Sequence, residues 1–550
     1  MPTYSLGLDF GTESVRAVIV DVRSGQIAGQ AAAEFATGVI DRELPLPHGR
    51  PLQPDSAFQH PHDWLSSAAI ASHDALSAAK VSPADVVGIG IDFTSCTILP
   101  TRADGTPLCL LEHFEREPMA WPKLWKHHGA HVEADRINDV ARRRDEPWLA
   151  RYGGVISLEW FFPKVLETLN RAPDVYAAAD VWLEAGDWFV WQLISYRDPG
   201  CRTEDLVRST CQAGYKAMWN RHDGYPSREF FAAVHPDLAD VVTRKMPGRL
   251  LAPGQRAGTL TAGSARLLGL REGTPVSTAI IDAHSGVPGS GVAEAGTLVM
   301  VMGTSSCHMV NATVEHLVPG VAGVVEDGIL PGFFGYETGQ ASVGDAFAWV
   351  ARTLGKSHEE LNGRAAELGP GSGGVLALDW LNGCRTPLMD GRLSGAFVGL
   401  TLGTRPEQLY RAMLEGTALG VRWIRDTLRD AGVPVNHHVA GGGLPGKSPL
   451  LMQICADVLG AEIRLAASDQ AVALGAAILG CLAAGEQSTG HRSIADAIRA
   501  MARVREDVVY RPDPATRDRY DALYALYREL GAADGVLGTA MRRLRAVNGE

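Results

Sequence analysis

The chain has 550 residues, of which 46% are hydrophobic and 21% charged, a composition that suits a soluble globular protein of more than one domain. Lys and Arg number 51 against 63 Asp and Glu, and the formal charge of -12 excludes a broad basic surface for nucleic acid or an anionic membrane. The eight cysteines form no CxxC pair, which argues against zinc ribbons and disulfide scaffolds and predicts reduced thiols in the cytoplasm.

Neither a leader nor a membrane span is predicted. The first four residues, "MPTY", lead almost directly into "SLGLDFG", without the basic region, apolar stretch and cleavage site of an export signal. The most apolar run, "AVALGAAILGCLAAG" from Ala471, is shorter than the ~20 residues that a membrane span requires. We therefore expect a cytoplasmic protein in which this run is a buried helix.

The first half of the chain opens with strands. From Ser5, apolar and polar residues alternate around a Gly-Thr pair and a Ser-Gly pair, which predicts antiparallel strands joined by tight turns. Helical periodicity covers residues 62–80, and "VVGIGIDF" then supplies a short apolar strand that reaches Asp92. Alternating strands and helices predict the α/β class.

The second half repeats this plan in structure and not in letters. From Thr297, "GTLVMVMGTSSCHMVNA" again predicts a strand, a Gly-Thr turn and a strand. Helices are expected at 341–355, 406–432 and 448–460, a strand at 437–443, and a mostly helical, charged end from about Ser493. There Tyr520, Leu523, Tyr524 and Tyr527 share one helical face, which we interpret as packing. The predicted domains are residues 1–290 and 291–485, followed by a helical tail at 486–550.

Two Gly-Thr turns are candidate phosphate sites. In "DFGTES", Asp9 leaves a strand where Gly11 and Thr12 expose backbone N–H groups to a polyphosphate, and Asp9 could orient Mg²⁺ through water. Taken alone, this stretch is an ordinary hairpin turn. "MGTSSC" offers Gly303 and Thr304 at the equivalent place in the second half, so two facing turns could hold one chain of phosphates from both sides.

Asp282 ends the apolar strand in "VSTAIIDAHSG", at the strand end where ligands collect in open α/β sheets. The alternative for a single Asp in this position is a helix N-cap. His284 is assigned a structural role.

The run "GGGLPGKS" from Gly441 fits the phosphate-binding pattern G-x-x-x-x-G-K-[ST]. Against a P-loop, Pro445 removes a backbone donor, and no later apolar strand supplies a Walker B carboxylate. The favoured alternative is a flat glycine surface for adenosine, with Ser448 capping the next helix and no catalytic role for Lys447.

With these residues identified, the chain resembles the FGGY carbohydrate kinases of the actin, Hsp70 and sugar kinase fold, and among them the bacterial ribulokinase group. The likeness runs from about Leu6 to Ala484. It is carried by "GLDFGTESVRA", "GIGIDFTSCTILP", "LWKHHGA", "ARYGGVISLEWFFPKVLE", "CQAGYKAMW", "DAHSG", "ETGQASVGDAFAW", "LDWLNGCRTP" and "SDQAVALGAAI".

The resemblance implies a two-domain, ribonuclease H-like α/β fold with its active site in the interdomain cleft. It implies ATP-dependent phosphorylation of L-ribulose in L-arabinose breakdown, with Mg²⁺, by a protein that could be a homodimer. Asp282 would be the general base. The sugar would meet Ser95, Trp125, Lys216, Asp282 and Glu337. ATP would meet Gly11, Thr12, Gly303, Thr304, Gly344, Gly442, Gly443 and Ser448.

Several alternatives remain open at this point. Lys216 could equally be a surface lysine lying along an aromatic ring. The same fold could serve another ketopentose or polyol, such as D-ribulose or xylulose, because one sequence does not fix how hydroxyl stereochemistry is recognised. A nucleotide-driven chaperone or filament protein is the alternative from another class.

Overall fold

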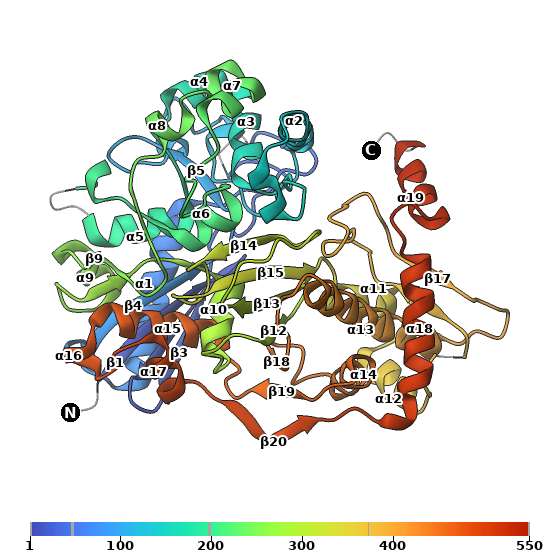
Figure 1. Cartoon of the computed structure of the whole chain (residues 1–550). Helices are drawn as coiled ribbons and strands as arrows, with labels where there is room; N and C mark the ends of the chain where they lie inside the picture. Colours follow the sequence, from blue (N-terminus) through green and yellow to red (C-terminus); the bar gives the residue numbers. More distant parts are fainter. Residues whose placement is uncertain (1–2, 46–48, 196–199, 372, 548–550) are drawn as a thin grey trace.

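Two seven-stranded sheets, one in each half of the chain, organise the computed structural model, which describes residues 3–45, 49–195, 200–371 and 373–547 (Figure 1). The strand order of the first sheet is β3-β2-β1-β4-β10-β9, and β11 pairs with β4. Its strands are β1 (Tyr4–Phe10), β2 (Ser14–Asp21), β3 (Ile27–Glu34), β4 (Val86–Phe93), β9 (Arg256–Thr259), β10 (Pro275–Ser277) and β11 (Ile280–Ile281).

The second sheet has the order β14-β15-β13-β12-β18-β19-β20. Its strands are β12 (Thr297–Met302), β13 (Ser306–Ala312), β14 (Gly323–Glu326), β15 (Phe334–Gln340), β18 (His437–Gly441), β19 (Ile463–Ala466) and β20 (Val504–Tyr510). In both sheets the first strand pairs antiparallel with the second and parallel with a later strand, as β1 does with β2 and β4, and β12 with β13 and β18. The strand, turn and strand predicted from Thr297 are therefore present.

Helices cover both sheets and form a separate layer above the first one (Figure 1). In the first half they are α1 (Pro61–Ala79), α2 (His131–Arg143), α3 (Phe161–Arg171), α4 (Pro173–Ala178), α5 (Ala185–Ser195), α6 (Thr210–Lys216), α7 (Arg228–Val234), α8 (Val241–Lys245), α9 (Ala262–Leu268) and α10 (Asp282–Gly289). In the second half they are α11 (Gly344–Leu354), α12 (His358–Ala366), α13 (Pro406–Asp430), α14 (Pro449–Leu459), α15 (Ala471–Ala484), α16 (Glu486–Thr489), α17 (Ile494–Met501), α18 (Arg517–Leu530) and α19 (Val536–Val547). Short two-stranded pairs join β5 (Ile98–Thr101) to β6 (Val181–Glu184), β7 (Val207–Ser209) to β8 (Arg249–Leu251), and β16 (Leu376–Leu378) to β17 (Ala396–Val398).

Helix α15 crosses back from the second half and packs on β1 and β4 of the first sheet (Figure 1). The contact requires glycine in the strands: a Cβ on Gly90 would lie 1.6 Å from the Ala476 carbonyl oxygen, and one on Gly7 would lie 2.2 Å from that of Ala473. The helix is buried, as its composition predicted. Within the described residues, no single helix is long and apolar enough to cross a membrane, and only α15 taken with residues 486–501, bent by 114°, meets the criteria of length and composition.

The C-terminal stretch differs from its prediction in one respect. It contains a strand, β20, which pairs antiparallel with β19 at the edge of the second sheet, whereas helix was expected throughout most of this stretch. The alternation in "VREDVVY" is the signal for this strand. The packing role of the tyrosine stripe on α18 is confirmed, because Tyr520 and Tyr527 are fully buried.

Candidate active site

Three carboxylates lie at the ends of neighbouring parallel strands in the first sheet. Asp9 in β1 is directly opposite Asp92 in β4, and Asp282 follows β11, whose last residue pairs with Phe93. Residues directly opposite each other point to the same face of a sheet, so the Asp9 and Asp92 side chains are neighbours. Sequence reasoning gave Asp92 no role, although the repeat of "GLDF" at 7–10 as "GIDF" at 90–93 is a signal that could have identified it.

The three carboxylates differ in their surroundings. Asp9 is 4% exposed, and its Oδ2 atom accepts a hydrogen bond of 3.0 Å from Arg16. Both oxygens of Asp92 are buried without a hydrogen-bond partner among the described residues. Burial, with the charges of Asp9 and Asp282 adding to it, raises the pKa of Asp92 well above its ordinary value. The repulsion between these carboxylates therefore favours a proton on Asp92 when no cation is near.

Asp282 is half-buried and is the first residue of α10, so it is not the N-cap that the alternative interpretation required. Its Oδ1 atom accepts a hydrogen bond of 2.7 Å from the backbone N–H of Ala283. Burial raises the pKa of Asp282 to about 7, with Asp9 and Glu337 contributing in the same direction. A carboxyl group with a pKa near neutrality can exchange a proton with an attacking hydroxyl.

The donor set fits a hydrated magnesium ion better than a directly ligated metal. In the described part of the chain, no group of three or more His, Cys, Asp or Glu side chains is arranged to hold a metal ion. Mg²⁺ usually retains several waters, and the unpartnered oxygens of Asp92 beside Asp9 are acceptors for such waters. These residues therefore fit Mg²⁺ bound through water.

The first Gly-Thr turn is closed by a hydrogen bond of 2.9 Å from the Gly11 N–H to the Ser14 carbonyl. Two residues fix Thr12: the indole N–H of Trp125 donates to its hydroxyl at 3.1 Å, and the Gln59 amide donates to its carbonyl at 2.6 Å. Trp125, a predicted sugar contact, thus touches the first phosphate turn.

The second Gly-Thr turn is joined to a helix N-terminus. Gly303 and Thr304 are exposed, and the N–H of Gly344, the first residue of α11, donates to the Gly303 carbonyl at 3.0 Å. The approach is close enough that a Cβ on Gly344 would lie 2.7 Å from that oxygen. Exposed turn amides beside a helix N-terminus form a suitable anion site.

The glycine run lies beside the second turn, because the Leu444 N–H donates to the carbonyl of Met302, the residue before Gly303. Gly442 has a φ of 88°, which favours glycine, and Gly443 and Lys447 are exposed. Ser448 stands at the N-cap position of α14, as predicted, but its side chain makes no capping hydrogen bond. Its φ of −131° and ψ of 75° depart from the extended backbone with which N-cap side chains reach the first helical amides.

Lys216 and Glu337 form a buried ion pair, with the ammonium nitrogen 2.7 Å from both carboxylate oxygens. The alternative of a surface lysine is therefore wrong. His284 was assigned a structural role, but its Nε2 atom lies 3.4 Å from Glu337, and its ring stacks on Tyr215. Burial opposes the charge on Glu337, but the Lys216 ammonium outweighs it and holds the pKa of this carboxyl below its ordinary value.

Ser95 is half-buried in the turn after β4, beside the buried Cys96. Burial raises the pKa of the Cys96 thiol to about 12, and the charges of Lys216 and Lys164 act against this rise. The Ser95 turn is therefore close to the Lys216–Glu337 pair. The structure brings Ser95, Trp125, Lys216, Asp282 and Glu337 to the end of the first sheet that also carries the first phosphate turn.

Arg385 and Glu159 belong to this region and were missed. Arg385 Nη1 lies 3.9 Å from the Cys307 sulfur, and Glu159 accepts a hydrogen bond of 3.0 Å from His128. Burial works against the Arg385 charge, but Glu159, Cys307 and Glu337 raise the pKa of Arg385 above its ordinary value. Both residues lie in irregular segments, so no periodicity in the sequence could have identified them.

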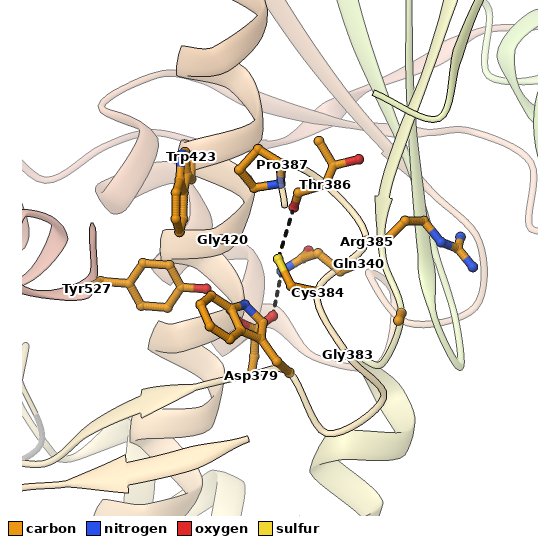
Figure 2. A pocket seen from close by; sticks show the side chains of 12 residues that line it. Gln340, Asp379, Gly383, Cys384, Arg385, Thr386, Pro387, Gly420, Trp423 and Tyr527 are labelled. Carbon is orange, nitrogen blue, oxygen red and sulfur yellow. Dashed lines mark hydrogen bonds between the residues drawn. The ribbon is translucent and has the colours of Figure 1, made fainter. Parts of the chain in front are cut away.

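A separate small cavity of about 10 Å³ lies beside Gln340, the last residue of β15, and the Arg385 side chain extends away from the aromatic side chains that line it (Figure 2). In it Asp379 accepts hydrogen bonds from the Tyr527 hydroxyl at 2.6 Å and from the Gln340 amide at 2.8 Å. This volume holds about one water molecule, so the cavity is not a sugar or nucleotide site.

Two family models match nearly the whole chain. Residues 4–289 match the FGGY family of carbohydrate kinases, N-terminal domain, and residues 298–484 match the C-terminal domain of the same family.

Curated relatives and solved structures agree with this match. A ribulokinase of Geobacillus thermodenitrificans is 47% identical over 96% of this chain and 94% of its own length. A ribulokinase of Mycolicibacterium smegmatis is 44% identical over 99% of this chain and 96% of its own length. The crystal structure of xylulose kinase from Rhodospirillum rubrum superposes with a TM-score of 0.76 at 23% identity, covering 96% of this chain and 98% of that one. A glycerol kinase of Plasmodium falciparum, solved with ADP, gives a TM-score of 0.73 at 15% identity, covering 96% and 98%.

Proposed function

The chain belongs to the FGGY family of carbohydrate kinases and has the two-domain fold of that family, and from this premise we propose that it transfers the γ-phosphoryl group of ATP to L-ribulose. The products are L-ribulose 5-phosphate and ADP. The similarity to ribulokinases over nearly the full chain supports this choice of sugar. The single observation that carries the chemistry is the Asp282 carboxyl group at the end of β11, which lies close enough to Asp9, Glu337 and Lys216 for their charges to affect its pKa.

Asp282 accepts the proton of the sugar hydroxyl as its oxygen forms a bond to the γ-phosphorus and the bond from that phosphorus to the ADP oxygen breaks. The transition state of phosphoryl transfer is loose, so the protein contributes mainly alignment and charge stabilisation. Asp282 suits the first task because its side chain is half-buried and fixed by the Ala283 N–H.

The sugar is proposed to lie against Ser95, Trp125, Lys216 and Glu337. Lys216 and Glu337 already satisfy each other's charge, so together they offer a donor and an acceptor to neighbouring hydroxyls without an unpaired buried ion. A sugar whose hydroxyl forms hydrogen bonds with both groups should bind more tightly than a sugar that leaves a buried donor or acceptor unsatisfied. The difference is about 1–3 kcal/mol per group.

ATP is proposed to lie between the two Gly-Thr turns, with its phosphates at Gly11, Thr12, Gly303, Thr304 and the N-terminus of α11 at Gly344. Adenosine would rest on Gly442 and Gly443, near Ser448. Mg²⁺ would be held through water by Asp9, with Asp92 beside it, and would neutralise charge on the transferring phosphoryl group. The proposed interdomain location of the site follows from these assignments, since the two turns belong to different sheets.

A related ketopentose or polyol remains the second candidate substrate, because the fold serves xylulose and glycerol kinases as well. A chaperone or filament protein is no longer favoured, because the family to which the chain belongs consists of carbohydrate kinases.

Steady-state phosphorylation assays with MgATP should compare D- and L-ribulose, D- and L-xylulose and glycerol. L-ribulose should give the highest kcat/KM, and phosphorus NMR of the product should show a phosphate on C5. A higher kcat/KM for glycerol or another ketopentose would overturn the choice of sugar. ATPase activity stimulated by unfolded peptide and independent of sugar would overturn the kinase assignment.

A further inference from the structure

Two of the proposed sugar contacts lie on segments that are far apart in the sequence but adjacent in space. Ser95 is in the turn after β4, and Trp125 lies in the stretch that follows the short helix Pro118–Ala120. The backbones of the two segments meet at Ile98 and Lys123, which exchange hydrogen bonds of 3.1 Å and 2.8 Å. These bonds leave the residues nearest the sugar to be held by other means.

Lys164 supplies a second connection at that place. Its ammonium nitrogen donates to the Cys96 carbonyl at 2.7 Å and to the Leu124 carbonyl at 2.8 Å. Each acceptor belongs to the residue next to a proposed sugar contact, since Cys96 follows Ser95 and Leu124 precedes Trp125. The side chain projects from the first turn of α3, a buried helix that contributes to neither segment.

The environment of Lys164 suits a side chain that bridges two backbone carbonyls, and not a surface ion pair. The residue is 0% exposed, and no carboxylate oxygen of the described residues lies within 4.0 Å of its nitrogen. A buried ammonium without a counterion is costly unless carbonyl dipoles satisfy it. The two carbonyls therefore fix the nitrogen, and the nitrogen in turn fixes the two carbonyls.

The backbone of Cys96 shows why such a tie is useful. Cys96 has a φ of 58°, a left-handed conformation that is unfavourable for a residue with a Cβ. Backbone in this conformation persists only when surrounding contacts hold it, and such positions cluster at functional sites. The Lys164 bond to the Cys96 carbonyl is one of those contacts.

We propose that Lys164 is a positioning residue for the sugar, whose ammonium group ties the Ser95 turn to the Leu124–Trp125 segment and so sets the distance between two sides of the sugar site. This inference rests on the proposed function, because Ser95 and Trp125 are sugar contacts only there. Lys164 itself is buried and touches neither substrate.

Lys164→Met tests the proposal, because methionine fills a similar volume and donates no hydrogen bond. Displacement of a substrate contact by about 1 Å can cost about a hundredfold. We therefore expect KM for L-ribulose to rise about tenfold to a hundredfold. KM for ATP should rise clearly less, because only Thr12 among the proposed ATP contacts is bonded to the displaced segment, through Trp125. A purely structural lysine would alter both KM values alike or only the melting temperature.

The matched control is Lys245→Met. Lys245 also bridges two backbone carbonyls, those of Tyr176 at 2.9 Å and Ala179 at 2.6 Å, but no proposed site residue adjoins either acceptor. Its KM for L-ribulose should stay at the wild-type value. An equal rise of this KM in both variants would overturn the proposal.

Hydrogen exchange followed by mass spectrometry gives a readout that is independent of catalysis. The amides of residues 94–98 and 123–126 should exchange faster in Lys164→Met than in wild type, and at the wild-type rate in Lys245→Met. If the wild-type protein phosphorylates no ketopentose, the proposed function fails, while the exchange data still decide whether the tie exists. Faster exchange without any change in KM would overturn the positioning role.

If Lys164→Met does not fold, Lys164→Gln replaces it, because glutamine retains an amide donor. This variant should show smaller changes in KM and in exchange, in the same direction. Wild-type KM and wild-type exchange in Lys164→Gln would also overturn the proposal.

Discussion

Lys216 and Glu337 form an ion pair that joins the two halves of the molecule. Lys216 is the last residue of α6 in the first half, and Glu337 lies in β15 of the second sheet. Their side chains are only 4% and 8% exposed, so water screens the pair little. If the two halves move apart to open the site, either these two charges separate or β15 moves together with α6.

Removal of either charge of this pair should destabilise the protein, because the other charge is then buried without its countercharge. Losses of about 3–5 kcal/mol are expected for Lys216→Met and for Glu337→Gln. The double variant should lose clearly less than the sum of the two. Denaturant unfolding of wild type, both single variants and the double variant measures this coupling. Additive losses would show that the two groups act independently.

Lys447 should have no catalytic role, although its sequence context matches a P-loop. It is exposed, and the glycine run around it lies beside the second Gly-Thr turn. Lys447→Ala should lower kcat by less than about tenfold, whereas loss of a lysine that stabilises the transferring phosphate costs about a hundredfold to a thousandfold. A folded Lys447→Ala protein with almost no turnover would restore the P-loop interpretation.

Asp379 should make stability depend on pH. Burial, opposed by hydrogen bonds from Tyr527 and Gln340, raises the pKa of Asp379 from 3.8 to about 6. The folded protein thus keeps a proton that the unfolded chain loses between about pH 4 and 6, and this contribution to stability is lost as pH rises through that range. A shift of about two units corresponds to about 3 kcal/mol.

Asp379→Asn removes the titration, so the melting temperature of wild type relative to this variant should fall from pH 4 to pH 6. Tyr527→Phe is the control, because it deletes the hydroxyl that donates to Asp379 but leaves the carboxyl group (Figure 2). It should lower the melting temperature, and the fall from pH 4 to pH 6 should stay at least as large, because the lost hydrogen bond opposed the rise in the pKa of Asp379. A constant difference between wild type and Asp379→Asn over this range would contradict the raised pKa.

The strands that carry the site were predictable because their periodicity is local. The alternation from Ser5, the apolar run to Phe93 and the return of the pattern at Thr297 depend only on which face of a strand is buried. The glycines in these strands had no such explanation. Gly7 and Gly90 are required because α15 packs against them, at Ala473 and Ala476 respectively. These contacts join distant parts of the chain, so only the folded structure shows them.

The site was predicted less completely than the fold. Asp92 becomes a neighbour of Asp9 only through the parallel pairing of β1 and β4, and Arg385 approaches Glu337 from an irregular loop. A serine before an apolar helix commonly caps it, and Ser448 does occupy the N-cap position of α14, but its side chain makes no capping hydrogen bond. Local preferences predicted elements, whereas contacts between distant segments decided the chemistry.

Asp282→Asn tests the proposed mechanism. An amide keeps the shape of the side chain and loses its basicity, so kcat should fall by about a hundredfold to ten-thousandfold. The affinity for ATP should stay within a few-fold, because the proposed ATP contacts are the two Gly-Thr turns and the glycine run, none of which the substitution touches. Steady-state turnover with L-ribulose and calorimetric binding of ATP, measured on the same folded variant, separate the two effects.

Asp187→Asn is the matched control, since Asp187 is another buried carboxyl group whose pKa burial raises to about 7, it also accepts a backbone N–H hydrogen bond, from Ser209 at 2.9 Å, and it is not a proposed site residue. Its kcat should change by less than about tenfold, below the smallest loss expected of a general base. The difference between the two variants carries the assignment, because both replace a buried carboxyl group of raised pKa with an amide. If Asp282→Asn retains more than about a tenth of the wild-type kcat, the loss is too small for a general base, and the base has to be sought at Glu337. If Asp187→Asn loses as much as Asp282→Asn, the effect belongs to the loss of a buried carboxyl group and not to proton transfer at Asp282.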